Sequence, residues 1–176
     1  EGTDDFTYVV SDGQLTSTAT VRLTVSQAFE GWVQGTAKAD TLVGGNDVSN
    51  WIFGGIGADT ISGGDRADRL AGGTGNDKLY GYDGEDEFWG MAGNDTIYGG
   101  AGTDTVHFNG VRASYSLVTS GGSIKVTDNQ TSVNGNDGVD TLSSIEQLLF
   151  RDAERVTLAA PIILDLDGMG VETKTA

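Results

Sequence analysis

One apolar side chain recurs every nine residues through the middle of the chain, and the polar positions around it keep the same period. In most units this residue lies between two variable residues, and the six residues before them contain two or three glycines and end in Asp. Glycine and Asp favour turns, whereas an apolar residue between two variable ones is typical of a short strand with one buried face. Each unit therefore predicts a six-residue turn followed by a three-residue strand.

Eight such units run from Gly35 to His107, and the second, residues 44–53, has one extra residue. Three units (54–62, 72–80 and 99–107) match Gly-Gly-x-Gly-x-Asp-x-apolar-x at every fixed position. A flexible Gly/Asp-rich linker would have a similar composition, but it has no reason to keep an apolar residue at the eighth position. We expect the apolar column to form a thin core between two sheets: Leu42, Ile52, Ile61, Leu70, Leu79, Phe88, Ile97 and Val106.

The period also predicts where the acidic side chains lie. Two units make one coil, so turns eighteen residues apart stack along one edge, and neighbouring strands of a sheet lie about 4.7–4.9 Å apart. Stacked carboxylates at such spacing repel each other and require a cation. One edge is predicted to carry Asp40, Asp59, Asp77 and Asp95, and the other Asn50, Asp68, Asp86 and Asp104.

Calcium fits these turns best because it accepts about six to eight oxygen ligands in irregular geometry, including the backbone carbonyls that glycine turns expose. Magnesium requires a more regular octahedron. Zinc prefers His and Cys, and the chain has one His and no Cys.

The tandem units resemble the RTX family of secreted bacterial proteins, whose nonapeptide repeats form calcium-binding rolls. The resemblance implies an all-β fold, a parallel β-roll that is a two-sheet right-handed β-solenoid. It also implies that each ion lies between stacked turns, bound by the carbonyls at positions 2 and 4 and the Asp of one turn, and by the carbonyls at positions 1 and 3 and the Asp of the turn eighteen residues on.

This rule gives four sites within the regular repeats. On the first edge they are Gly55, Gly57, Asp59, Gly72, Thr74 and Asp77, and then Gly73, Gly75, Asp77, Gly90, Ala92 and Asp95. On the second edge they are Gly64, Arg66, Asp68, Gly81, Asp83 and Asp86, and then Tyr82, Gly84, Asp86, Gly99, Ala101 and Asp104.

The first coil follows the rule less closely. It adds the ligands Asp40, Gly54, Ile56, Gly63 and Asp65, but Thr36 and Lys38 replace glycines and Asn50 replaces the Asp, so binding by these three residues stays open. We expect about four ions, and at most about seven. The roll should need them to fold, because one buried side chain contributes roughly 1.5–3 kcal/mol and has to order nine residues at about 1–2 kcal/mol each.

The composition of the chain restricts the kinds of partner that it can bind. The 176 residues include 28 glycines and carry a formal charge of -16. So acidic a surface makes nucleic acid and anionic membranes poor partners. Before calcium binds, repulsion between the acidic side chains keeps the chain expanded. No apolar stretch reaches the about 18 residues of a membrane span, and the lack of cysteine fits a protein stabilised by calcium outside the cell rather than by disulfides.

The N-terminal flank predicts further β-structure. Two alternating runs around Ser11-Asp12-Gly13 predict a hairpin within residues 1–26, and this segment resembles the last two strands of the immunoglobulin- or cadherin-like repeats of large bacterial adhesins. We expect residues 27–34, with Phe29, Trp32 and Val33, to cap the first coil of the roll at 35–107.

The C-terminal flank, residues 108–160, predicts a capping β-segment. Tyr115–Val118 and Ile124–Thr127 predict a hairpin, and 135–143 repeats the nonapeptide loosely, with Asp137 and Asp140 either binding one more ion or belonging to a solvated turn. The run 141–150 resembles the segment that closes RTX rolls in serralysin-like proteins, so we expect Ile145, Leu148 and Phe150 to cover the last coil.

Residues 161–176 resemble the start of a module that often follows such repeats. Asp165 and Asp167 lie at positions 1 and 3 of a loop like that of an EF-hand, but Met169 replaces the third acidic residue and no Glu occupies position twelve. Calcium binding there stays open. We interpret the chain as a piece of a larger polypeptide whose flanking domains are its neighbours.

The outward strand positions of one sheet are unusually aromatic, with Trp51, Phe53, Trp89 and His107. We expect this face to pack on a flank or to bind a ligand, and His107 to be an ordinary surface histidine.

No catalytic motif is present: there is no HExxH, no GxSxG and no Cys nucleophile. The sequence therefore predicts a non-enzymatic, calcium-binding module that folds on meeting calcium outside the cell or at the bacterial surface. The resemblance implies export by the type I secretion machinery. Two alternatives stay open: an adhesin module that binds a ligand through the aromatic sheet, and a scaffold beside a self-processing or hydrolytic module.

Overall fold

The computed structural model describes residues 2–11, 16–25, 31–130 and 136–158. These residues form an all-β structure with one short 3-10 helix, η1 (Arg112–Ser114). None of the helical structure in these ranges has the length and apolarity needed to cross a membrane. The C-terminal loop with Asp165 and Asp167 lies outside the described residues.

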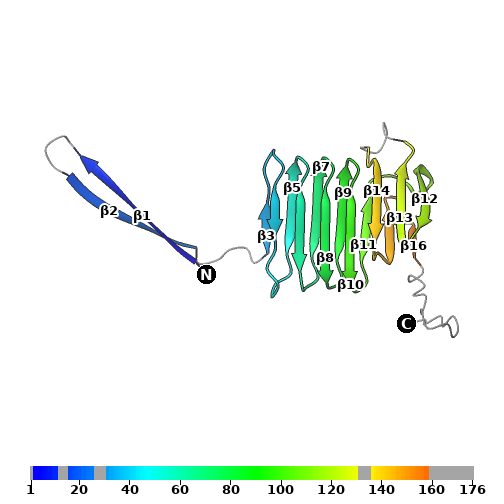
Figure 1. Ribbon diagram of the computed structural model, residues 1–176, viewed down its shortest axis with the longest axis horizontal. Coiled ribbons are helices and arrows are strands. Elements are labelled where there is room, and N and C mark those ends of the chain that lie inside the picture. The colour runs from blue at the N-terminus through cyan, green and yellow to red at the C-terminus, as the bar shows by residue number, and fades with distance from the viewer. Residues whose placement is uncertain (1, 12–15, 26–30, 131–135, 159–176) are drawn as a thin grey trace.

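The N-terminal hairpin is a two-stranded antiparallel sheet of β1 (Gly2–Ser11) and β2 (Thr16–Val25) (Figure 1). Its register pairs Gly2 with Val25 and Ser11 with Thr16, which confirms the expected hairpin, while the residues between Ser11 and Thr16 lie outside the described ranges.

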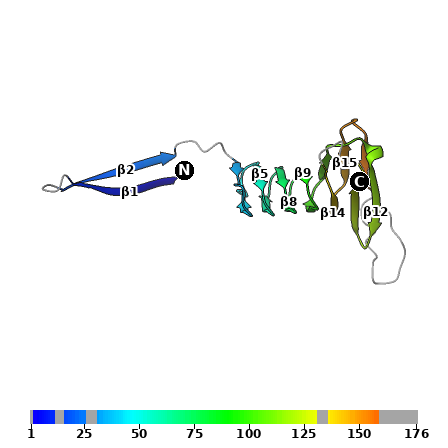
Figure 2. The same ribbon diagram turned by 90° about the horizontal axis from the view of Figure 1, so that it is seen from above.

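The repeats form a roll of two sheets. Successive strands alternate between the sheets, so that each strand pairs in parallel with the strand eighteen or nineteen residues away. Figure 2 shows the coils in a row along the axis of the roll. One sheet contains β4 (Thr41–Val43), β6 (Thr60–Gly64), β8 (Lys78–Asp83) and β10 (Thr96–Ala101); the other contains β3 (Trp32–Gln34), β5 (Trp51–Ile56), β7 (Arg69–Thr74), β9 (Glu87–Ala92) and β11 (Thr105–Phe108).

Most of these strands are longer than the three residues that the period predicts. In β5 the strand continues through Gly54 to Ile56, and Gly55 and Ile56 pair with Gly73 and Thr74 of the next coil. Stacking in register supplies backbone partners for the first part of the turn as well, and buried backbone groups need such partners. The expected division into turn and strand is therefore wrong by about three residues.

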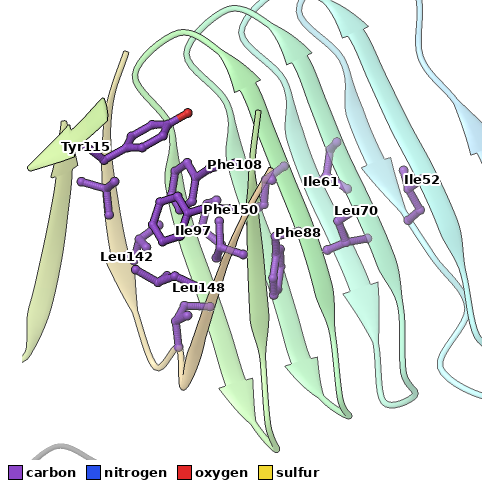
Figure 3. Close-up of a cluster of buried hydrophobic side chains, with 14 residues drawn as sticks. Ile52, Ile61, Leu70, Phe88, Ile97, Phe108, Tyr115, Leu142, Leu148 and Phe150 are labelled. Atoms are coloured by element: carbon purple, nitrogen blue, oxygen red, sulfur yellow. The ribbon is translucent and has the colours of Figure 1, made fainter. Parts of the chain in front are cut away.

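The core is the predicted apolar column. From Ile52 to Val106 each member is at most 1% exposed, and Leu42, at the open end, is half-buried. Figure 3 shows Ile52, Ile61, Leu70, Phe88 and Ile97 of this column between the two sheets, with Phe108, Tyr115, Leu142, Leu148 and Phe150 at the C-terminal end.

The roll extends beyond the repeat. After β11 the chain forms the hairpin of β12 (Tyr115–Ser120) and β13 (Ser123–Asp128), which was expected, and then returns to the roll. β14 (Val139–Ser143) pairs in parallel with β10, and β15 (Gln147–Phe150) with β11, so each sheet gains one further parallel strand. Antiparallel strands then finish both sheets: β13 on β14, and β16 (Arg155–Thr157) on β15.

The outer aromatic positions divide into two groups. At the N-terminal end, the rings of Trp32 and Trp51 meet edge to face at 5.1 Å and both side chains are 51% exposed. Further along, Trp89 stacks on His107 at 4.4 Å. The expectation of an ordinary surface histidine is wrong, because His107 is half-buried and its Nε2 is buried with no hydrogen-bond partner among the described residues.

Candidate metal centre

The acidic side chains form two columns at the corners of the roll. In each column the backbone N–H of one member donates to a carboxylate oxygen of the member one coil on, at 2.6 to 2.9 Å. The structure therefore brings together the residues that the period assigns to each edge. The first column is Asp40, Asp59, Asp77, Asp95 and Asp140, and the second is Asn50, Asp68, Asp86, Asp104 and Glu146.

One oxygen of each interior Asp stays without a partner. Within the described part of the chain, the buried Oδ2 atom of six aspartates accepts no hydrogen bond: Asp59, Asp68, Asp77, Asp86, Asp95 and Asp104. Burying an unpaired carboxylate oxygen costs roughly 1–3 kcal/mol of folding free energy or more, unless a cation or a hydrogen-bond donor compensates it. The columns therefore supply six equivalent oxygen donors that lack a counter-charge.

The same oxygens explain the first glycine of each turn. A Cβ at Gly54 would lie 2.5 Å from Asp59 Oδ2 and also 2.5 Å from the carbonyl oxygen of Gly72, one coil on. Equivalent Cβ positions at Gly63, Gly72, Gly81, Gly90 and Gly99 lie 2.1 to 2.4 Å from the Oδ2 of their own turn's Asp. An unpaired carboxylate oxygen and, from the next coil, a backbone carbonyl thus border one small space that only glycine leaves open.

Positions 2 and 4 of the turns lie over the carbonyls of the coil before. A Cβ at Gly73 would be 2.1 Å from the Gly55 oxygen, and a Cβ at Gly75 would be 1.8 Å from the Gly57 oxygen. Most residues at these positions have positive φ, including the non-glycine residues Tyr82 (79°) and Met91 (71°). The other members of this set are Gly55, Gly57, Gly64, Gly73, Gly75, Gly84, Gly93, Gly100 and Gly102.

Three of the predicted ligand carbonyls already take part in hydrogen bonds. The N–H groups of Gly57, Gly75 and Gly84 donate to the position-3 carbonyls of the next coil, at 2.8 to 2.9 Å: Thr74, Ala92 and Ala101. A carbonyl oxygen has two lone pairs, so each of these keeps one for an ion.

Electrostatics in the columns are unfavourable without a cation. Burial, followed by repulsion from neighbouring carboxylates, raises the pKa of Asp86 and Asp95 to about 7 and that of Asp104 to about 6. Burial also raises the pKa of Asp68 and Asp77. A bound divalent cation reverses this effect because its charge favours the ionised carboxylates.

The first coil departs from the pattern. Asp40 lies at the open end, where the N–H and hydroxyl of Thr36 donate to its Oδ2 at 2.6 and 2.8 Å and lower its pKa. Lys38, at position 4 of its turn, does not have positive φ, and in the second coil the same holds for Arg66. These turns therefore differ from the glycine-rich ones.

Asn50 fills its own corner. Its Nδ2 donates to the carbonyls of Gly45 and Val48 at 3.0 Å, to Asp68 Oδ1 at 2.9 Å and to Gly63 at 3.4 Å. An amide nitrogen with these acceptors therefore occupies the space between the two turns. A ligand role for Asn50 stays open.

Asp137 and Asp140, in the C-terminal flank, have different environments. Asp140 continues the first column and burial raises its pKa to about 9. Asp137 is buried too, but both of its oxygens are used: the side chain and N–H of Asn109 donate to it at 3.1 and 3.0 Å, and so does the hydroxyl of Tyr115. A solvated turn is therefore the wrong interpretation of this segment, since its backbone and side chains are packed on the roll.

No three His, Cys, Asp or Glu side chains converge as a metal-binding group within the described ranges. The donors that the corners offer are single carboxylate oxygens together with backbone carbonyls, which is the hard, all-oxygen chemistry of calcium. Two residues near this chemistry were missed from the sequence, Ser144 and Glu146. The signal for them was the Glu-Gln-Leu run, which has the Asp-x-apolar spacing of a repeat.

A family model for the RTX calcium-binding nonapeptide repeat matches the chain in four overlapping copies, at residues 30–61, 45–79, 62–95 and 80–110. No curated protein matches the chain. Among solved structures, the extracellular lipase LipA from Serratia marcescens is similar, with 21% identity and a TM-score of 0.48 over 63% of this chain. The similar part is 22% of the lipase chain. RTX nonapeptide repeats bind calcium, the segment 30–110 of this chain matches them, and its described part, residues 31–110, lies in a two-sheet parallel β-roll.

Proposed function

We propose that this chain is a non-enzymatic calcium-binding module that becomes ordered when calcium fills the corners of the roll. The observation that carries the proposal is the set of six buried, unpaired Oδ2 atoms, each beside a turn glycine. A metal-free roll would have to bury this unpaired charge. An ion at each corner supplies the counter-charge and joins two coils at once.

Four of the six oxygens lie between units of the uninterrupted repeat. We first propose one ion at each of these four oxygens, which belong to Asp59, Asp68, Asp77 and Asp86. The ligand sets are those that the repeat rule gives for residues 55–77, 64–86, 73–95 and 82–104. A fifth ion at Asp95 would lie between the turn at 90–95 and the turn that ends at Asp140.

Folding and binding should form one equilibrium. The corners exist only when coils stack, and within the repeats the core is a single column of side chains. A site that is absent from the unfolded chain converts binding free energy into folding free energy. The acidic chain should therefore be expanded at low calcium and compact at high calcium.

Circular dichroism during a calcium titration tests this proposal on the full chain, with magnesium as the matched control ion. We expect disorder in chelator, a cooperative gain of β-structure with calcium, and little change with magnesium, which demands a tighter octahedron. A roll already folded in chelator, or an equal response to both ions, would contradict the proposal.

We further propose that this equilibrium operates during export. A chain kept unfolded by low calcium inside the cell would pass through a type I secretion channel and fold outside. Secretion of the chain with its exporter should slow when the columns are altered so that folding no longer depends on calcium.

A second candidate function concerns the exposed pair of Trp32 and Trp51. These rings line an open hollow of about 420 Å³ with Arg69, whose guanidinium lies 6.0 Å from the Trp51 ring and 2.9 Å from Glu87. Exposed aromatic rings beside charged groups are typical of sugar- or peptide-binding surfaces. A glycan and peptide screen should then lose its signal in Trp51→Ala and keep it in Trp89→Ala, because Trp89 stacks on His107 outside this hollow.

A further inference from the structure

The second acidic column ends in a segment that is not a recognisable repeat. Resting on the calcium-binding function proposed above, we propose that Asp104, Ser144 and Glu146 form a further calcium site, which joins the closing segment of the chain to the last regular coil. This segment lies outside the residues that the repeat model matches, which end at 110.

The backbone register gives Glu146 the place of a repeat Asp. Gln147 and Leu148 pair in parallel with Thr105 and Val106, the two residues that follow Asp104. The N–H of Gln147 donates to the Asp104 carbonyl at 2.9 Å, as the N–H of Thr105 does to the Asp86 carbonyl at 2.8 Å. Residues 146–148 therefore correspond to the Asp-x-apolar part of a unit.

The side-chain contact repeats as well. The Asp104 N–H donates to Glu146 Oε2 at 2.8 Å, just as the Asp86 N–H donates to Asp104 Oδ1 at 2.9 Å. Asp104 and Glu146 are forty-two residues apart in the sequence, whereas Asp86 and Asp104 are eighteen apart. Glu146 thus makes the contact that links consecutive members of the column.

Ser144 supplies the carbonyl that a repeat takes from its first glycine. A Cβ at Gly81 would lie 2.7 Å from the Gly99 carbonyl oxygen one coil on, whereas a Cβ at Gly99 would lie 2.0 Å from the carbonyl oxygen of Ser144. Ser144 reaches this position with a φ of +51°, which is unusual for a residue with a side chain. Glu146 follows Ser144 by two positions, whereas the Asp of a unit follows its first glycine by five.

This shorter connection explains the choice of Glu. A three-residue link omits half of the six-residue turn, and the additional methylene of Glu lets its carboxylate extend further from the backbone than that of Asp.

Asp104 Oδ2 is the unpaired oxygen that would bind the ion in this site. Its side chain is 0% exposed, this oxygen has no hydrogen-bond partner among the described residues, and it lies 2.4 Å from the same Cβ position at Gly99 that Ser144 approaches. The site therefore combines an unpaired buried carboxylate oxygen, a second carboxylate and a backbone carbonyl. Carbonyls of the turn at 99–104 would be the further donors, which gives the all-oxygen set that calcium prefers.

Counting bound calcium in Glu146→Gln tests the site. The Gln side chain keeps an oxygen that accepts the Asp104 N–H, so the variant removes the charge and retains the hydrogen bond. Glu154→Gln is the matched control, because Glu154 is exposed and lies in the same C-terminal segment. Native mass spectrometry of each full chain at saturating calcium should show one ion fewer for Glu146→Gln and the unchanged number for Glu154→Gln.

The same number of ions in Glu146→Gln as in the unaltered chain would overturn the site while leaving the proposed function intact. An unaltered chain that binds no calcium would overturn both. Should Glu146→Gln not fold, anomalous scattering from crystals of the unaltered chain grown with calcium decides: a peak bounded by Asp104, Ser144 and Glu146 supports the site, and its absence there while other corners are filled overturns it.

Discussion

Replacing Asp77 by Asn tests whether the carboxylates in the middle of the columns bind the ions that drive folding. Asp77 accepts the N–H of Asp59 through one oxygen, and its second oxygen is buried and unpaired. In the proposed arrangement it contributes to two ions, one shared with Asp59 and one with Asp95. Asn is nearly the same size and keeps an oxygen for the Asp59 N–H, so the change removes a ligand charge from two sites and little else.

The expected magnitude follows from linkage. An ion present at about 100 times its dissociation constant stabilises the bound state by about 2.7 kcal/mol, so the loss of two ions removes about 5.4 kcal/mol, which is comparable with the roughly 5–15 kcal/mol of a whole domain. About four ions remain, and each restores about 1.4 kcal/mol per tenfold rise in calcium, so the midpoint of folding should move about tenfold upward.

The measurement is a calcium titration followed by circular dichroism, with Asp83→Asn as the control. Asp83 is exposed and its substitution changes the net charge equally, but its side chain is not in a column. We expect a shift of about tenfold for Asp77→Asn and a small one for Asp83→Asn. Equal shifts in the two variants would show that general charge, and not the corner sites, controls folding, and would refute this reasoning.

Three further predictions concern the turns and the columns. Gly75→Ala should abolish calcium-dependent folding, because its Cβ would lie 1.8 Å from the Gly57 oxygen. Gly45→Ala should fold with a nearly unchanged midpoint in the same titration, because its Cβ would lie 3.3 Å from the Val48 side chain. Asn50→Asp should add one ion in native mass spectrometry, because it removes the amide that fills that corner; an unchanged ion number would refute this role for Asn50. Without metal, the raised folded-state pKa values mean that the roll is stabilised below the unfolded value of about 3.9 and loses this stabilisation as the pH rises through about 6 to 7. β-Structure by circular dichroism in metal-free buffer should therefore increase as the pH falls from 8 to 4, and calcium should bind more weakly over the same range. A pH-independent metal-free signal would contradict the raised pKa values of Asp86, Asp95 and Asp104.

The sequence predicted the parallel roll and, within the repeats, the membership of both columns, because a strict period fixes the phase. Once two units make one coil, residues eighteen apart must stack, and this one condition places Asp59 beside Asp77 and Ile61 beside Leu79. Asp140 could also be assigned from its nonapeptide spacing. None of these placements depends on contacts between segments of different type.

The closing segment was only partly predicted. Burial of Ile145, Leu148 and Phe150 could be expected from their pattern, but not that β15 continues the roll in register with β11. The hairpin β12–β13 interrupts the period, so counting by nines no longer gives the phase. The place of Glu146 in the second column became clear only from the pairing of Gln147 with Thr105.

By itself, the sequence determined the repeat, the core column, the two acidic edges and the chemistry of the ion, since each follows from local spacing. Only the tertiary structure decided which oxygens are left unpaired, that the Asn50 amide fills its corner, that Asp137 accepts from Asn109 and Tyr115, and that Glu146 continues the second column. The physical reason is that hydrogen-bond satisfaction depends on every group that surrounds an atom in space, and a one-dimensional period specifies only the neighbours that share its phase.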